Sequence, residues 1–339
     1  MNLTEIKNRF VGISCAHVDG SGNVDTKCYG LSDMEDNKAV DENTIFPACS
    51  ISKFVTAFCI MRLNEQGLID IDKPVNDYLK DWKLLTSEGG ESGAPIRTLL
   101  NHTAGIYDGE DAFYGLRRSD TSVRLLDILE GRTSYNNRPA RAKNTSEMNF
   151  EYSDAGYCVL QQMLQDKLNK TFDDIARELV FDPLGLNSTF FASPENVDLF
   201  ESKGIMATGY DDKGEAIPGK YPYVPDLAAS GLWSTPTELL KIAGELAKAI
   251  NGKSTLLKKE SAEEMVKPNE KFSWIGLGLF MGGENEVVSN GWGENGQCKL
   301  KVNYRTGEAS VVMANQNPGV DQSESGIDWL LNNGFTREK

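Results

Sequence analysis

Histidine is the residue that this chain most clearly lacks, because 339 residues contain only His17 and His102. A Ser-His-Asp hydrolase would have to use one of these two, and a metal site built from several histidines is all but excluded. His102 stands in the segment LLNHTAG, where we expect a structural hydrogen-bonding role, and we assign no role to His17. The sequence therefore predicts neither a metal nor an organic cofactor.

Paired cysteine motifs, a leader and long apolar runs are also missing. None of the six cysteines forms a Cys-x-x-Cys pair, and several stand in apolar stretches such as AFCIM and GYCVL, which is typical of free thiols in a reducing compartment. The opening MNLTEIKNRF has no apolar signal core, and no run of about 18 apolar residues could span a membrane. These absences predict a cytoplasmic protein, although a chain trimmed of its signal would look the same.

Basic residues are too few for a protein that binds nucleic acid. The formal net charge is -15 and the pI about 4.7, so the chain repels phosphate backbones and anionic lipid surfaces. We therefore expect no nucleic-acid and no membrane partner. The length of 339 residues, with 40% hydrophobic content, is enough for a sizeable core in one large or two intimate domains.

Patterning along the chain predicts strands at both ends and a long helical middle. Alternation indicates strands over 10–18 and 24–29 joined by a turn, and later strands over 276–280, 298–304 and 309–314. Spacings of three and four predict helices over 50–66, 96–100, 123–129, 157–168, 172–179, 237–250 and 326–333. We expect an α+β fold in which the two ends share one antiparallel sheet and the middle forms a helical insertion.

One short motif carries possible chemistry: Ser50-Ile51-Ser52-Lys53 at the start of a predicted helix. Residues three apart share a helix face, so the Lys53 amine can lie beside the Ser50 hydroxyl. The helix N-terminus favours an alkoxide and should also favour a neutral, desolvated Lys53 that accepts the serine proton. Alone the motif is weak, because a helix-capping serine near a surface lysine has the same spacing.

Longer segments make the motif specific. The stretches FPACSISKFVTAFCIMRLNEQGLIDIDKPVNDYL, IRTLLNHTAGIYD, YSDAGYCVLQQML, DPLGLNSTFF, AASGLWSTPTELLKIA and WIGLGLF follow one another in order. Together they resemble the serine β-lactamase and penicillin-binding-protein superfamily, closest to its class C β-lactamase, D-peptidase and esterase branch. The resemblance covers about residues 13–317 and implies an antiparallel sheet flanked by helices with a mainly helical second region. It implies one unit over 1–339, with 1–78 and 235–339 as the α/β region and 79–234 as the helical region.

The resemblance implies roles for three residues. Ser50 is similar to the acylated nucleophile, Lys53 to its proton acceptor or hydrogen-bond partner, and Tyr152 to the tyrosine of the Tyr-x-Asn motif. Either Lys53 or Tyr152 could be the base. The family's oxyanion hole implies amides from Ser50 and from the strand of the third motif, for which we expect Glu294.

The chain departs from the family at three places. Asp154 replaces the asparagine, where it would hold Lys53 protonated or pair with it. The third motif lies in NGWGENG, as either Gly291-Trp292-Gly293 or Trp292-Gly293-Glu294, and neither supplies the usual cation. Asp154, Trp292, Gly293 and Glu294 are the candidate substrate-binding residues. The family's Pro-Gly before the tyrosine is missing at 144–148, which we expect to alter only a loop.

The sequence thus predicts a serine hydrolase that acts through a Ser50 acyl-enzyme on a small ester, amide or peptide. The missing cation favours an esterase or amidase over a β-lactamase; a D-peptidase stays open, since an arginine could replace that cation, and so does a transacylase. The alternative is a penicillin-binding or other binding protein with a decayed site and little turnover. Five aromatic side chains could line the pocket: Phe46, Tyr114, Tyr221, Tyr223 and Trp233.

Overall fold

The computed structural model describes residues 1–143 and 149–335, so the expectation for the 144–148 loop lies outside the described residues. The helices are α1 (Leu3–Lys7), α2 (Ser52–Glu65), α3 (Ile96–Leu100), α4 (Leu125–Leu129), α5 (Asp154–Leu168), α6 (Phe172–Ala176), α7 (Pro194–Ser202), α8 (Leu227–Ser230), α9 (Pro236–Ile250), α10 (Lys259–Met265), α11 (Gln322–Ser325) and α12 (Ile327–Asn333). The strands are β1 (Gly12–Val18), β2 (Val24–Asp33), β3 (Lys38–Ala39), β4 (Phe46–Cys49), β5 (Leu85–Thr86), β6 (Arg141–Ala142), β7 (Phe190–Phe191), β8 (Leu232–Ser234), β9 (Phe280–Met281), β10 (Glu286–Gly293), β11 (Gly296–Asn303) and β12 (Ala309–Ala314).

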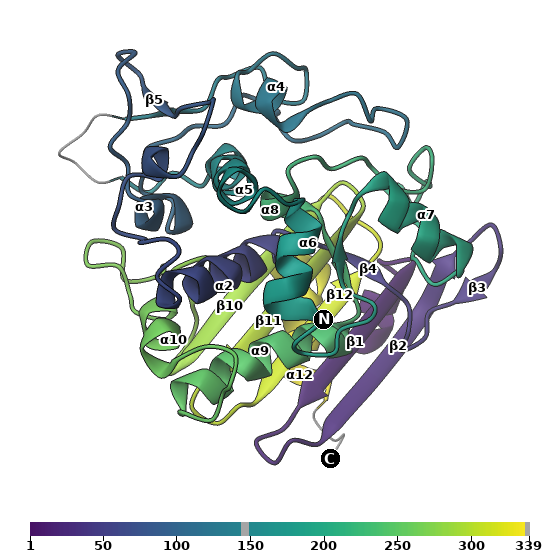
Figure 1. Cartoon of the computed structure of the whole chain (residues 1–339). Helices are drawn as coiled ribbons and strands as arrows, with labels where there is room; N and C mark the ends of the chain where they lie inside the picture. The colour runs from purple at the N-terminus through teal and green to yellow at the C-terminus, as the bar shows by residue number, and fades with distance from the viewer. Residues whose placement is uncertain (144–148, 336–339) are drawn as a thin grey trace.

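A seven-stranded antiparallel sheet joins the two ends of the chain. Its order is β3-β2-β1-β12-β11-β10-β9, so β1 lies between its hairpin partner β2 and the last strand β12 (Figure 1). The shared sheet predicted from the sequence is therefore confirmed. The turn before β2 forms because the Asp19 side chain accepts hydrogen bonds from the Ser21 and Asn23 amides.

Alternation along the central strands gives the sheet two apolar faces. Ile13 and Cys15 of β1 pack with Ile6 and with the α12 residues Ile327 and Leu330. On the opposite face, Ala16 and alternate residues of β11 and β12 join the main core, against which α9 packs. Helices therefore cover both faces of the sheet, as side chains that alternate along a strand require.

Helix α2 lies near the centre of the view in Figure 1 and packs against α6, α8 and α10. Every residue from Ser52 to Met61 is buried, including Lys53, which is 3% exposed. The predicted helix is confirmed, and it is buried along this whole stretch because other elements of the fold pack around it. A short sheet, β4-β8-β7, holds the segment that enters α2.

One predicted strand is mostly absent from the structure, and one observed strand was not predicted. The expected strand over 276–280 is mostly a loop, because Gly278 takes a positive φ of 73° and approaches α2 so closely that a Cβ would lie 2.7 Å from the Lys53 carbonyl oxygen. The sequence reading also missed β10, whose glycines weaken the strand pattern although its burial alternates.

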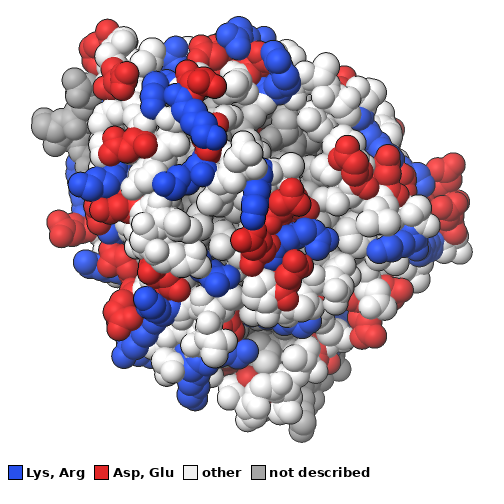
Figure 2. All heavy atoms as spheres, in the orientation of Figure 1, with Lys and Arg blue, Asp and Glu red and all other residues white. Residues whose placement is uncertain are grey.

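Acidic and basic side chains are interspersed over the face shown in Figure 2, and no continuous basic stripe crosses that face. Such a stripe is what tracks a nucleic-acid backbone. Within residues 1–143 and 149–335, no helix has the length and apolarity needed to cross a bilayer.

Candidate active site

Ser50 stands at a tight turn between β4 and α2. Cys49 has a positive φ of 46°, and its carbonyl accepts a 2.6 Å hydrogen bond from the Ser52 hydroxyl. The same Ser52 hydroxyl accepts the Leu232 amide of β8 at 2.9 Å. These bonds fix the backbone on either side of Ser50, and the first turn of the helix then brings Lys53 Nζ to 3.0 Å from Ser50 Oγ. The geometry expected from the Ser-x-x-Lys spacing is confirmed.

The Lys53 ammonium is buried among oxygen atoms. Its Nζ donates to Ser50 Oγ and, at 2.9 Å, to the Ala229 carbonyl of α8, and it lies 2.5 Å from Asp154 Oδ1. Burial alone would lower the pKa of Lys53, but the Asp154 carboxylate and Tyr152 raise it above its ordinary value. The 2.5 Å contact agrees with the expected pairing of Asp154 with Lys53, and this direction of the pKa shift favours a protonated Lys53 over a neutral one.

Tyr152 covers Lys53 on the side of the solvent. Its ring centroid lies 4.8 Å from Lys53 Nζ, and its hydroxyl contacts the Ser50 and Lys53 side chains. Burial of that hydroxyl raises the pKa of Tyr152, and the Lys53 ammonium offsets part of this effect. Tyr152 is thus a neutral phenol at physiological pH.

His102 supports Tyr152 from behind. The two rings stack at 4.4 Å, and His102 Nδ1 accepts the Ser153 amide at 3.2 Å. Burial, together with the charge of Lys53, holds the pKa of His102 well below its usual range. This neutral, bonded ring agrees with the structural role expected for His102.

The N-terminus of α5 positions Asp154 through a second carboxylate. Asp108 accepts hydrogen bonds from the Ser153 hydroxyl at 2.6 Å and from the Asp154 and Ala155 amides at 2.8 and 3.0 Å. Burial and the neighbouring Asp154 raise the pKa of Asp108 to about 6. The sequence reading gave no role to Asp108, although this residue ends the segment IRTLLNHTAGIYD, because its partners lie more than 40 residues later in the chain.

A third carboxylate, Asp226, lies fully buried behind the site. It accepts a 2.7 Å bond from the Tyr135 hydroxyl, and its Oδ2 has no hydrogen-bond partner among the described residues. Burial and Asp154 raise the pKa of Asp226 to about 7. Its backbone oxygen accepts the Ala229 amide, so Asp226 helps to set the turn that presents the Ala229 carbonyl to Lys53. No sequence signal pointed to this residue.

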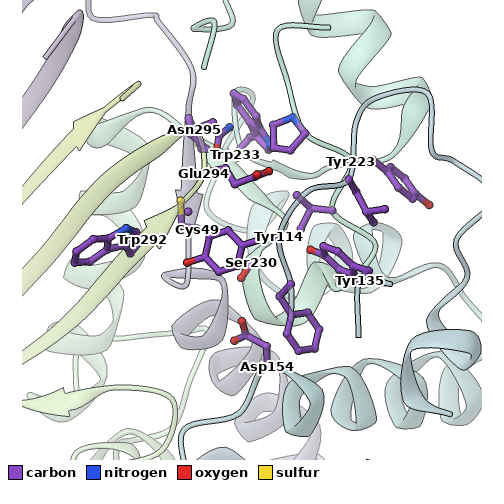
Figure 3. A pocket seen from close by; sticks show the side chains of 16 residues that line it. Cys49, Tyr114, Tyr135, Asp154, Tyr223, Ser230, Trp233, Trp292, Glu294 and Asn295 are labelled. Carbon is purple, nitrogen blue, oxygen red and sulfur yellow. The ribbon is translucent and has the colours of Figure 1, made fainter. Parts of the chain in front are cut away.

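The predicted substrate-binding residues line one cleft. Asp154 lies at one end of this cleft, and Trp292, Gly293 and Glu294 lie where β10 turns into β11 (Figure 3). Ser50, Lys53 and Tyr152 line a smaller adjoining hollow. Of the five aromatic candidates, the cleft is lined by Tyr114, Tyr223 and Trp233. Phe46 and Tyr221 are instead buried in the core and do not line it.

The third-motif strand lies directly against the segment that precedes Ser50. A Cβ on Gly291 would lie 2.1 Å from Cys298 Sγ and 2.5 Å from the Ala48 carbonyl, so only glycine fits there. Beyond the strand, the Glu294 carboxylate faces Arg117, whose Nη1 lies 3.1 Å from Oε2. Arg117 comes from the loop before α4, and the sequence reading did not identify it.

Among the residues that the structure describes, no group of three or more His, Cys, Asp or Glu side chains is placed to hold a metal ion. The six cysteines are free thiols, and five of them are buried.

The resemblance found in the sequence implies a serine beside a lysine and a tyrosine in a fold of sheet and helices, and the structure has this arrangement. The chain belongs to the Beta-lactamase family, whose model matches residues 3–331. The resemblance read from the motifs and the expected fold class are thus confirmed.

Two curated relatives and one solved structure show the range of this similarity. The chain is 29% identical over 215 residues to Unguisins hydrolase ungD' of Aspergillus campestris, covering 62% of this chain and 38% of that protein. It is 25% identical over 223 residues to Teichoic acid D-alanine hydrolase of Staphylococcus aureus, covering 65% of this chain and 50% of that protein. The matches therefore span half or less of these relatives. The penicillin binding protein from Bacillus halodurans superposes with a TM-score of 0.75 at 19% identity, covering 96% of this chain and 99% of that one.

Proposed function

We propose that the protein is a serine hydrolase. In this proposal Ser50 attacks a small ester or amide and becomes acylated, and water then hydrolyses the acyl-enzyme to free Ser50. The observation that carries this proposal is the 3.0 Å contact between Ser50 Oγ and an ammonium group held in place by Asp154. A positive charge at that distance stabilises the serine oxygen as its proton leaves. The hydrolase names of the curated relatives support the same class of reaction.

The proton of Ser50 needs an acceptor, and the site limits the choice. Lys53 already holds three protons and Tyr152 holds its own, so neither accepts one in the resting state. Lys53 can take the Ser50 proton only while it gives one to Asp154, which lies 2.5 Å away. The proposed route therefore runs from Ser50 through Lys53 to Asp154. Tyr152, in contact with Ser50 and Lys53, gives its proton to the leaving group, and the proton held by Asp154 returns through Lys53 to Tyr152, which restores all three groups.

Esters and amides fit the cleft better than β-lactams do. The residues that line it include Asp154 and Glu294 but no lysine, arginine or histidine. Asp154 is paired with Lys53 and Glu294 with Arg117, so the lining offers the carboxylate of a β-lactam no cation of its own to pair with, which disfavours binding. The amide of Glu294 remains the proposed second donor of the oxyanion hole, next to the Ser50 amide.

The test compares wild type with Ser50→Ala and with Ser87→Ala. Ser87 is an exposed serine, so its alanine variant serves as a matched control. Hydrolysis of p-nitrophenyl butyrate and p-nitrophenyl acetate is measured together with the mass of the acid-quenched protein. We expect wild type and Ser87→Ala to turn over and to carry an acyl group on Ser50, and Ser50→Ala to do neither. Equal rates for Ser50→Ala and wild type would refute the nucleophile, and an acyl group that forms once without turnover would indicate a binding protein.

A further inference from the structure

A groove lies at one end of the central sheet and shares no lining residue with the cleft or with the hollow beside Ser50. Because Val18 pairs with Ala309, the turn at 19–23 and the turn at 304–308 are neighbours. Asn251, just after α9, ties that helix to the second turn by donating to two of its carbonyls. The two turns and α9 line a space of about 600 Å³, which is within the usual range for small-molecule sites. This space is called the α9 groove.

The floor of the α9 groove is apolar. Val18 and Val24 come from the first hairpin, Leu240 and Ala247 from α9, and Leu184 from the segment after α6. Val24 is 58% exposed, although its neighbours in the groove are also hydrocarbon. An alkyl chain placed on this floor would be removed from water together with these side chains, which favours binding.

Gly244 keeps the groove open at the middle of α9. Glycine destabilises a helix interior relative to alanine, so a glycine there usually has a packing reason. Here no neighbour requires it, because a Cβ on Gly244 would meet nothing within 4 Å, and Gly244 lines the groove. The residue therefore leaves room beside the apolar floor.

The charge around this floor is the reverse of the charge of the chain. The whole sequence has 50 acidic and 35 basic residues, yet four cations and a single carboxylate line the groove. The cations are Lys241, Lys248, Lys253 and Arg305. Lys248 lies 3.5 Å from Glu245, whereas the other three form no ion pair with any residue that the structure describes. An anion bound here would supply the missing partner.

The remaining polar side chains of the lining are already hydrogen-bonded. Asp19 accepts hydrogen bonds from its own turn, and Asn251 donates to backbone carbonyls. The Thr237 hydroxyl shares a hydrogen bond with a neighbouring threonine, and the Thr306 hydroxyl accepts a backbone amide. The cations are thus the polar groups of the groove that are left to recognise a ligand.

We propose that the α9 groove binds a free carboxylic acid with an alkyl chain, as in a medium-chain fatty acid. The chain lies on the apolar floor beside Gly244, and the carboxylate lies among the lysine and arginine side chains. A net charge of -15 disfavours an anionic bilayer as the alternative source of such a ligand. This inference does not rest on the proposed function, since none of the groove residues takes part in it.

The experiment uses ligands that differ only in the head group. Calorimetry at pH 7 titrates octanoate, 1-octanol and octylammonium into the wild-type protein. We expect octanoate to bind saturably and roughly tenfold tighter than 1-octanol, the effect of one good charge-assisted contact, and octylammonium not to bind. Shortening the acid toward butanoate should weaken binding by up to roughly fourfold for each CH₂ removed.

Variants of the groove locate the binding. Lys241→Gln combined with Arg305→Gln should bring the affinity for octanoate close to that for 1-octanol. Gly244→Phe, whose ring would occupy the groove, should weaken both ligands. Lys80→Gln changes an exposed lysine outside the groove and should leave both affinities as in wild type. The cation variants decide the question by themselves if Gly244→Phe lowers the stability in urea.

Three outcomes would overturn the inference. Equal affinities for octanoate and 1-octanol, or a preference for octanoate that survives the double substitution, would remove these cations as the receptor. Inorganic phosphate that displaces octanoate at an equal concentration would show a simple anion site with no role for the alkyl chain. Sedimentation with phosphatidylcholine–phosphatidylglycerol vesicles that is lost in the double variant would assign the groove to a lipid surface instead.

Discussion

Lys53 and Asp154 form a buried ion pair at the one position where this chain departs from the asparagine of the family motif. An asparagine can orient a lysine but cannot accept a proton from it. The substitution therefore changes how the Ser50 proton can leave, and its effect can be measured by restoring the amide.

Replacing Asp154 by asparagine should change the pH dependence of the reaction. Without the carboxylate, burial lowers the pKa of Lys53, which then accepts the serine proton directly once it is neutral. We expect kcat/KM of Asp154→Asn to be about 10²-fold below wild type at pH 7 and to rise steadily with pH, whereas wild type is nearly flat from pH 7 to 9. Parallel profiles for the two proteins would argue against the route through Asp154. Asp25→Asn, at an exposed site, controls for the lost charge.

The same variant should show a matching change in stability. In wild type the pKa of Lys53 is raised, so wherever Asp154 is ionised the ion pair stabilises the fold in full below the unfolded Lys53 pKa of about 10.4, and this stabilisation is lost as the pH rises further. In Asp154→Asn the folded pKa of Lys53 falls below that value. The free energy of unfolding of Asp154→Asn, measured with urea, should be lower than that of wild type by up to about 3–5 kcal/mol at pH 7. This difference should shrink as the pH rises toward 10.

At the scale of single residues, the sequence identified Ser50, Lys53 and Tyr152, and the structure brings these three side chains together. Their spacing within motifs made that possible. Asp108, Asp226 and Arg117 were missed, because each acts through a partner that is distant in the sequence: Asp226 meets Tyr135 across 91 residues and Arg117 meets Glu294 across 177. Only the fold creates such pairs, so no local pattern announces them.

At the scale of elements, helices were predicted more accurately than strands. Helix α9 begins as expected, with Thr235 capping it and Pro236 in its first turn, because capping and proline signals are local. Helix α5 begins at Asp154 rather than at 157, since Ser153 caps it with help from Asp108. Strand β10 was missed because its glycines have a low strand propensity. They are present because β10 lies in close contact with β4, where a Cβ would not fit.

Glycine substitutions in two elements should therefore have opposite effects. Gly291→Ala places a methyl group against Cys298 and the Ala48 carbonyl, which must push β10 away from the segment before Ser50. We expect a loss of roughly 1–3 kcal/mol in the free energy of unfolding, together with reduced ester hydrolysis. Gly244→Ala, in the middle of α9 where a Cβ meets nothing within 4 Å, should stabilise the protein by about 0.5–1 kcal/mol. If both variants unfolded at the same urea concentration, the close approach of β10 would not be a real constraint.

At the scale of the whole molecule, the central sheet combines segments from both ends of the chain. The assignment of 1–78 and 235–339 to one region and 79–234 to another stays a prediction. What the structure shows is that β4, which leads into Ser50, pairs with β8, some 180 residues later. Site and sheet therefore depend on contacts between distant parts of the sequence.

This arrangement predicts where backbone hydrogens exchange most slowly. Strands β1 and β12 are hydrogen-bonded to neighbours on both sides and lie between two apolar layers, so their amides should open only when the whole molecule unfolds. The two-residue strands β5 and β6 form a small separate sheet and should exchange early. Hydrogen exchange followed by mass spectrometry measures both. Exchange of β1 well before β11 would contradict a single cooperative sheet.

The position of β1 between β2 and β12 also has a consequence for biosynthesis. A ribosome releases the β1–β2 hairpin some 280 residues before it releases β12, which occupies the other edge of β1 in the finished sheet. Throughout that interval the hairpin presents an open edge, which readily pairs with a neighbouring nascent chain. Synthesis speed and holdase chaperones should therefore determine how much active protein a cell obtains, even where the folded molecule itself is stable.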